Sequence, residues 1–260
     1  MQAGQGDLGD GPATGSGGDP MERGGPQGPA PRHPLLDIRP AGAPSHPMLE
    51  AALLFAAFYL AAFLPADPSA MGRSLGRIGF HLLLLADTLP KALLVLYMMS
   101  RAEGPAAFGL GRMRRRDLGR GLMVALGALA LVALPSLAMG SLGLTNPLLG
   151  AALRPSTPAV AVVLVVLVSS LSVGYSEELF FRVFLIRRLR QAGFPAPWAL
   201  LASSLLFGSA HGLQGPLGLA LGTLLGLWFA WRWHRSGNIH EIALGHAIYD
   251  ALVILFTLYR

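Results

Sequence analysis

The sequence contains no cysteine, which excludes disulfide bonds and thiolate ligands, so any metal ion would have to be held by His, Glu and Asp. Charged residues are scarce as well, at 13% of the chain against 53% hydrophobic residues. A soluble domain of 260 residues needs more charge to cover its surface. We therefore expect membrane lipid to surround much of this chain.

Lysine is almost absent, because Lys91 is the only one and arginine supplies the rest of the basic charge. A net charge of +6 can indicate nucleic-acid binding. Here the arginines lie mainly between apolar runs, which is the pattern that sets the orientation of membrane proteins. We therefore expect membrane lipid, and no nucleic acid, as a partner.

Aromatic residues are missing from residues 1–47, which are dense in Gly, Pro and Ala. Such a segment cannot bury enough apolar surface to offset its chain entropy, so the sequence predicts a disordered tail. It is not a signal peptide, because no basic segment precedes an apolar core near the start.

Apolar runs long enough to cross a bilayer then follow in series. They predict an all-α, polytopic transmembrane helix bundle of about seven spans, with six or eight as alternatives. Arginines after the second, fourth and sixth runs place those ends, and the N-terminus, in the cytoplasm; Arg73 and Arg77 oppose this weakly. The runs are 48–64, 78–100, 121–139, 157–185, 197–212, 217–233 and 239–259.

Ionisable side chains stand inside three of the later runs, where each costs at least about 2.5–3.5 kcal/mol and needs a reason. At about 1.5 Å of rise per residue, Glu177 lies about 15 Å from the boundary at Arg187. By the same measure His246 lies about 12 Å, Asp250 about 18 Å and His211 about 21 Å from their own helix starts. Three helices therefore bring polar groups to a similar depth on the cytoplasmic side.

Helical spacing also assigns these side chains to faces. Glu178 and Arg182 share one face at i, i+4, as do His246 and Asp250. The adjacent Glu177 and Glu178 point about 100° apart, so they should have different roles. We interpret Glu178 and Arg182 as an internal ion pair, which leaves Glu177 beside the imidazoles and suited to activating water.

Other polar and aromatic residues in the runs are expected to be structural. Asp87 and Lys91 stand at i, i+4 and should neutralise each other. Trp228, Trp231 and Trp233 are interpreted as an aromatic belt at the membrane interface. A lone intramembrane His or Glu is also often an interhelical hydrogen-bond partner.

Three motifs, each on its own apolar run, resemble those of the CPBP intramembrane proteases. That family includes the type II CAAX prenyl endopeptidases and the bacterial abortive-infection and bacteriocin-immunity proteins. The resemblance covers about residues 157–259. The motifs are Glu177-Glu178-x-x-x-Arg182, Phe207-x-x-x-His211 and His246-x-x-x-Asp250.

The tail and the first apolar runs lie outside the resemblance. We therefore expect three parts of the chain: a disordered cytoplasmic tail over 1–47, N-terminal transmembrane helices over 48–156 and CPBP-like catalytic transmembrane helices over 157–260. The resemblance implies a site that opens toward the cytoplasmic side, in which Glu177 activates water for peptide-bond hydrolysis. His211 would assist or bind metal, and His246 would stabilise the oxyanion.

This sequence departs from the family at Asp250, where the family commonly has Asn. An ionised Asp cannot donate a hydrogen bond to an oxyanion. Asp250 is therefore protonated by its surroundings, a metal ligand or a group that orients His246. Whether a metal is needed stays open, and Zn²⁺ suits the available ligands. The predicted catalytic residues are Glu177, Glu178, Arg182, His211, His246 and Asp250, and the candidate metal ligands are His211, His246, Glu177 and Asp250.

The predicted activity is that of an intramembrane (metallo)endopeptidase of the CAAX-protease type, acting on a membrane-associated or C-terminally processed peptide or protein. The arginine-rich composition is typical of a GC-rich bacterial genome, so the bacterial inner membrane, with bacteriocin-like or sorting-signal peptides, fits better than prenylated substrates. The alternatives are a proton-coupled transporter and a catalytically inactive immunity or scaffold protein. The oligomeric state is left open.

Overall fold

Prolines and side-chain caps set the helix boundaries in the computed structural model, which describes residues 46–102, 109–155 and 158–260. Pro47 and Pro68 each occupy a first helical turn, where the missing N–H costs nothing. The Asn238 side chain caps the last helix by accepting a hydrogen bond from the His240 N–H, and Gly237 (φ 58°) ends the helix before it.

Every regular element in the described ranges is helical, as the sequence predicts. In chain order the elements are α1 (Pro47–Tyr59), η1 (Leu60–Phe63), α2 (Pro68–Ser74), α3 (Ile78–Ala102), α4 (Arg115–Ser141), α5 (Pro147–Gly150), α6 (Ala159–Glu178), η3 (Leu179–Leu185), α7 (Ile186–Gln191), α8 (Ala196–Ala210), η4 (Gly212–Gln214), α9 (Gly215–Ser236) and α10 (Ile239–Tyr259).

The predicted count of about seven membrane spans is not confirmed. Five helical segments of the described chain are long and apolar enough to cross a bilayer, and six if a bent pair is counted. That pair is α1–η1 with α2, which meet at 94°. The run at 197–212 forms α8, whose 15 residues span about 22 Å, less than the roughly 30 Å of a bilayer core. The predicted count is therefore not confirmed, although each predicted run is helical.

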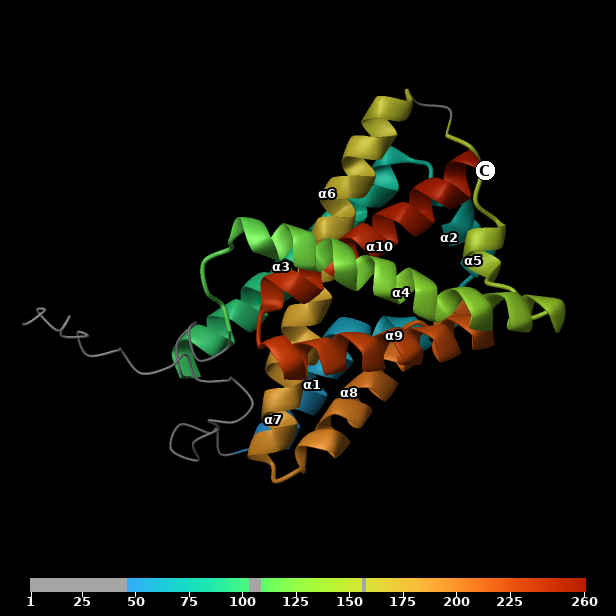
Figure 1. Cartoon of the computed structure of the whole chain (residues 1–260). Helices are drawn as coiled ribbons and strands as arrows, with labels where there is room; N and C mark the ends of the chain where they lie inside the picture. Colours follow the sequence, from blue (N-terminus) through green and yellow to red (C-terminus); the bar gives the residue numbers. More distant parts are fainter. Residues whose placement is uncertain (1–45, 103–108, 156–157) are drawn as a thin grey trace, which may run out of the picture. The chain divides into compact units, whose positions relative to one another are not determined.

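The helices that carry the three motifs pack against one another. In Figure 1, α10 lies against α6 and α4, and α8 lies against α9. Glycines allow the first of these contacts, because a Cβ added at Gly174 of α6 would lie 2.7 Å from the Ala243 oxygen of α10. Small residues at such crossings are typical of membrane helix pairs.

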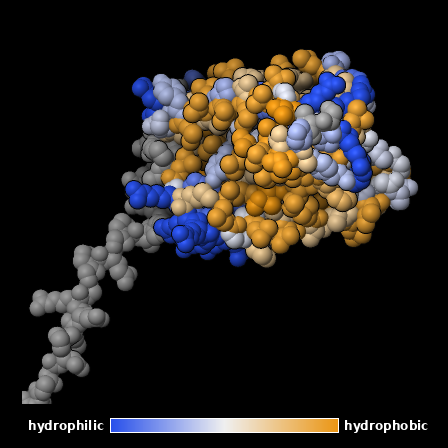
Figure 2. Space-filling model, turned by 90° about the horizontal axis from the view of Figure 1, so that it is seen from above, coloured by the Kyte–Doolittle hydropathy of each residue, from blue (hydrophilic) through white to orange (hydrophobic). Residues whose placement is uncertain are grey.

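Large apolar side chains remain exposed on the outside of the bundle. Figure 2 shows a broad hydrophobic area with hydrophilic residues gathered toward its margins. Among the exposed side chains are Leu83, Leu134, Leu137 and Phe256, each more than 70% exposed. Water would not favour such a surface, so together with the long apolar helices it identifies an integral membrane protein.

Two of the structural expectations have different outcomes. Lys91 lies 2.6 Å from Asp87, which confirms the predicted ion pair. The aromatic belt is wrong for Trp233, which is buried in the core, whereas Trp231 is exposed. The predicted tail at 1–47 falls outside the described residues up to residue 45, and its last residue, Pro47, already begins α1.

Candidate active site

The first motif lies where a long helix changes its geometry. Residues from α6 through α7 form one continuous helical segment, but Leu179–Leu185 adopt π-helical geometry directly after Glu178. All seven π-helical residues are buried. A π segment adds a residue to the turn and is frequent at functional sites. At this change of geometry, the side chains of Glu178 and Arg182 are both buried in the core.

Glu178 and Arg182 form the predicted internal ion pair. The Arg182 Nε lies 3.1 Å from the Glu178 Oε2, and both side chains are fully buried. Three aromatic rings surround the guanidinium, whose carbon is 4.2 Å from the Phe207 ring centroid, with the Phe181 and Phe229 rings at 5.7 and 5.6 Å. Because a buried charge is tolerated only with partners, this ion pair and its aromatic cage are needed together.

His246 of α10 is held between carboxylates of two helices. Its Nδ1 lies 2.8 Å from the Glu178 Oε1, within hydrogen-bond distance. Its Nε2 lies 3.4 Å from the Asp250 Oδ2 and 3.8 Å from the Glu177 Oε2. The Phe229 ring stacks on the imidazole at 4.9 Å. The Glu178 carboxylate can only accept, so the Nδ1 donates, and this bond fixes how the Nε2 faces the other two acids.

Glu177 differs from its neighbour in both exposure and bonding. Its side chain is 19% exposed, whereas Glu178 is fully buried. The Glu177 Oε2 is itself inaccessible and has no hydrogen-bond partner within the described chain. A carboxylate oxygen without a donor, at the edge of a buried imidazole, is suited to accept a proton.

His211 reaches the site less directly. It ends α8, and its Nδ1 lies 2.8 Å from the Phe207 carbonyl oxygen. The Phe207 ring packs on both histidines, with its centroid 4.7 Å from that of His211 and 5.8 Å from that of His246. Among the described residues His211 makes no hydrogen bond or ion pair with the other predicted site residues, although it is near enough to Asp250 to interact electrostatically.

The structure therefore brings five predicted residues into direct contact and leaves the sixth at the margin. Glu178 is linked to Arg182 and His246, and the Nε2 of His246 faces Glu177 and Asp250. The contact between Glu178 and His246 joins residues 68 positions apart, and no local pattern predicts it.

Tyr59 is a residue near the site that the motifs do not include. It ends α1, is buried, and its ring packs at 4.8 Å on that of Phe181. Its hydroxyl interacts electrostatically with Glu177 and Arg182. The available sequence signal was the close spacing of the aromatic residues Phe55, Phe58 and Tyr59 within one apolar run.

The predicted metal ligands do not form a ready binding group. Within the described residues no three His, Asp or Glu side chains are arranged to hold a metal ion together. The His246 Nδ1 is engaged by Glu178 and the His211 Nδ1 by a backbone oxygen. These bonds leave the Nε2 of each histidine as the nitrogen that could ligate, so Zn²⁺ at this site stays a prediction.

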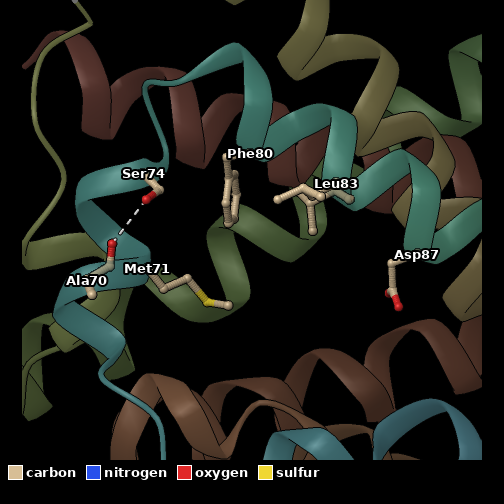
Figure 3. A pocket seen from close by; sticks show the side chains of 7 residues that line it. Ala70, Met71, Ser74, Phe80, Leu83 and Asp87 are labelled. Atoms are coloured by element: carbon tan, nitrogen blue, oxygen red, sulfur yellow. Dashed lines mark hydrogen bonds between the residues drawn. The ribbon is translucent and has the colours of Figure 1, made fainter.

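A separate pocket of about 530 Å³ lies between α2 and α3. Figure 3 shows Met71 and Phe80 on its wall and Asp87 at one end. None of the predicted site residues lines it. The acid–imidazole cluster is therefore a different place in the fold from this apolar pocket.

The fold and the site together define a class: a helical membrane protein with a buried acid–imidazole centre. Residues 159–252 match the family model described as type II CAAX prenyl endopeptidase Rce1-like, and this range includes all six predicted site residues. This match confirms the resemblance to the CPBP proteases over that segment. No curated protein and no solved structure matches the chain.

Proposed function

We propose that the chain is an intramembrane endopeptidase in which Glu177 activates the hydrolytic water. The observation that carries the proposal is the position of the Glu177 Oε2, inaccessible, without a hydrogen-bond partner in the described chain and 3.8 Å from the His246 Nε2. A general base and a donor must lie within reach of the same reacting group, and this pair meets that requirement.

The roles of the other residues follow from their contacts. Glu178, neutralised by Arg182, accepts the His246 Nδ1–H and orients the ring. When the imidazole is fully protonated, its Nε2–H points toward the acids Glu177 and Asp250 and can donate to an oxyanion. Asp250 shares the α10 face with His246 and serves as the group that holds this proton in place.

In the proposed hydrolysis, Glu177 takes one proton from water and later gives it to the leaving amine. The water oxygen bonds to the peptide carbonyl carbon while its proton moves to the Glu177 carboxylate, and the oxyanion accepts the His246 Nε2–H bond. The C–N bond then breaks, and Glu177 returns the proton to the leaving amine. The products are a carboxylic acid and an amine, and no co-reactant beyond water is needed.

The substrate is proposed to be a membrane-associated or C-terminally processed peptide or protein. The site lies on helices that also present apolar side chains outward, so a substrate already in the bilayer would meet it laterally. We propose the bacterial inner membrane, with the N-terminus in the cytoplasm, as the location, on the strength of the arginine distribution.

The test is hydrolysis of membrane peptides by purified wild type, Glu177→Gln and Glu50→Gln, followed by mass spectrometry. Because Glu50 pairs with the buried Arg188, its amide variant controls for the loss of a buried ion pair elsewhere in the fold, and its thermal stability is measured beside its activity. We expect Glu177→Gln to lower the rate by about 10²–10⁴-fold, and the control to keep the wild-type rate at temperatures where it remains folded. Equal cleavage by Glu177→Gln and the control variant would exclude Glu177 as the general base.

Two additions to the assay separate the remaining alternatives. A chelator that abolishes wild-type activity would establish a metal requirement, and full activity in chelator would exclude one. A wild type that folds but yields no cleaved product from any peptide, while moving protons in proteoliposomes, would support the transporter instead.

A further inference from the structure

Four arginines crowd the start of α4 and form what we call the arginine surface. All four side chains are exposed. Within a few residues the helix turns apolar, and Leu118 and Leu122 are about half exposed, at 51% and 47%. The arginine surface consists of Arg112, Arg114, Arg115 and Arg116.

No acidic side chain in the described residues compensates this charge. Asp117 is next to it in sequence but is buried, and its two oxygens accept hydrogen bonds from the Arg114 N–H and the Asn238 side chain. Glu241, also buried, pairs with Arg232 and lies 3.9 Å from Arg120. The described acids nearby therefore face inward, and the four guanidinium groups face outward together.

The position of the arginine surface indicates which kind of ligand can reach it. α4 is one of the membrane-spanning candidates, and the arginines directly precede its apolar part. In a bilayer that α4 spans, guanidinium groups at this end of the helix are level with the lipid phosphates. Arginine binds phosphates through paired hydrogen bonds. At the helix N-terminus the Arg114 N–H already donates to Asp117, and the proposal rests on the guanidinium groups.

We propose that the arginine surface binds the phosphates of anionic phospholipid headgroups. Each basic side chain near an anionic membrane surface contributes about fivefold to binding. The lipid also reduces the repulsion among four neighbouring like charges, which no described acidic side chain offsets.

The arginine surface is connected to the helix that carries His246. Asn238, which caps α10, donates to Asp117 at 2.8 Å, and the His240 Nε2 lies 2.8 Å from the Gly111 oxygen. Farther along, a Cβ added at Gly121 of α4 would lie 2.8 Å from the Leu244 Cβ, so α4 and α10 are in close contact. Lipid bound at the arginine surface therefore stabilises the beginning of α10.

The test measures lipid binding without any substrate, so it does not depend on peptidase activity. Native mass spectrometry of the purified full chain is used with dioleoylphosphatidylglycerol or dioleoylphosphatidylcholine. We expect Arg115→Gln/Arg116→Gln to weaken phosphatidylglycerol binding at least about tenfold. The matched control is Arg73→Gln/Arg77→Gln, two exposed arginines before α3, and it should bind as wild type.

Further variants and a competitor complete the test. Arg115→Lys/Arg116→Lys keeps the charge and should retain most of the binding. The proposal is overturned if the glutamine variant binds phosphatidylglycerol as tightly as wild type, if the control loses as much, or if inorganic phosphate at equal concentration displaces the lipid. The last result would mean a site for soluble anions.

The connection to α10 has its own measurement. Hydrogen exchange is followed over residues 239–247 in nanodiscs of phosphatidylcholine with and without phosphatidylglycerol. We expect phosphatidylglycerol to slow exchange in wild type and not in Arg115→Gln/Arg116→Gln. Unchanged exchange in wild type would overturn the link between the arginine surface and α10, whatever the peptidase assay shows.

Discussion

At the scale of single residues, the two nitrogens of His246 have separate tasks. The Nδ1 is committed to a fully buried carboxylate, and the Nε2 faces two carboxylates that are still partly accessible. This asymmetry separates adjacent Glu177 and Glu178 into one carboxylate that is partly exposed and one that is fully buried. The 100° rotation between neighbouring helical positions is the physical origin of that difference.

Asp250→Asn distinguishes the possible roles of the third acid. An amide can donate a hydrogen bond, so if residue 250 faces the oxyanion, the variant should cleave at least as fast as wild type. If Asp250 supplies a negative charge to a metal or to His246, the rate should fall by at least about tenfold. Peptide cleavage by the two proteins at equal concentration, with Asp87→Asn as the control, decides between them.

The buried ion pair predicts a strong effect on stability. Arg182→Gln leaves the Glu178 carboxylate without its cation in the core, which should lower the free energy of unfolding by about 3–5 kcal/mol. Thermal unfolding in detergent measures the loss. The double variant Glu178→Gln/Arg182→Gln removes both charges and should be less destabilised than Arg182→Gln alone. A double variant that is the less stable of the two contradicts this account.

At the scale of the elements, the site depends on close crossings between helices. α6 brings the two glutamates and α10 brings the histidine, so their distance is set by how near the two helices approach. Gly174 lies three residues before Glu177, at the point of contact. Arg182 lies in the π-helical turn that follows and contacts Glu178.

Gly174→Ala tests the crossing. The added methyl group would lie 2.7 Å from the Ala243 oxygen and 3.0 Å from the Ala247 nitrogen, so α6 and α10 must move apart. We expect destabilisation of about 1–3 kcal/mol, together with loss of cleavage. Gly119→Ala is the control, because nothing lies within 4 Å of its added carbon, and it should be stabilising by about 0.4–1 kcal/mol.

At the scale of the whole molecule, we expect the two ends of α4 to lie on opposite sides of the membrane. The segment before α4 is joined to the start of α10 through the Gly111 oxygen and His240. Beyond α4 and α5, Arg154 donates to the backbone oxygen of the C-terminal Arg260 at 3.0 Å. α4 has 27 residues and is about 40 Å long, enough to separate the two ends across a bilayer.

Single-cysteine labelling tests this arrangement. Because the sequence has no native cysteine, only the introduced cysteine can react. Arg112→Cys and Arg235→Cys should react with an impermeant maleimide from one side of sealed vesicles. Arg154→Cys should react only from the other side. Labelling of Arg112→Cys and Arg154→Cys from the same side would mean that α4 does not cross the membrane.

Much of the fold was predictable because hydropathy and helical spacing are local properties. All seven apolar runs are helical, the Asp87–Lys91 and Glu178–Arg182 pairs form as their i, i+4 spacing requires, and the motif segment is confirmed at family level. The number of spans was not predictable, because a run of apolar residues does not reveal that α8 stays short or that α1 and α2 meet at 94°.

The sequence by itself determined that this is a helical membrane protein, which residues carry its motifs and which neighbours pair along one helix. Only the tertiary structure decided three contacts between distant segments. Glu178 hydrogen-bonds to His246 of another helix, the Phe207 ring packs on both histidines, and Tyr59 of α1 packs on Phe181. The physical reason is that a helix presents a face through its own sequence, whereas the partner of that face depends on crossings, bends and a π turn that involve distant segments.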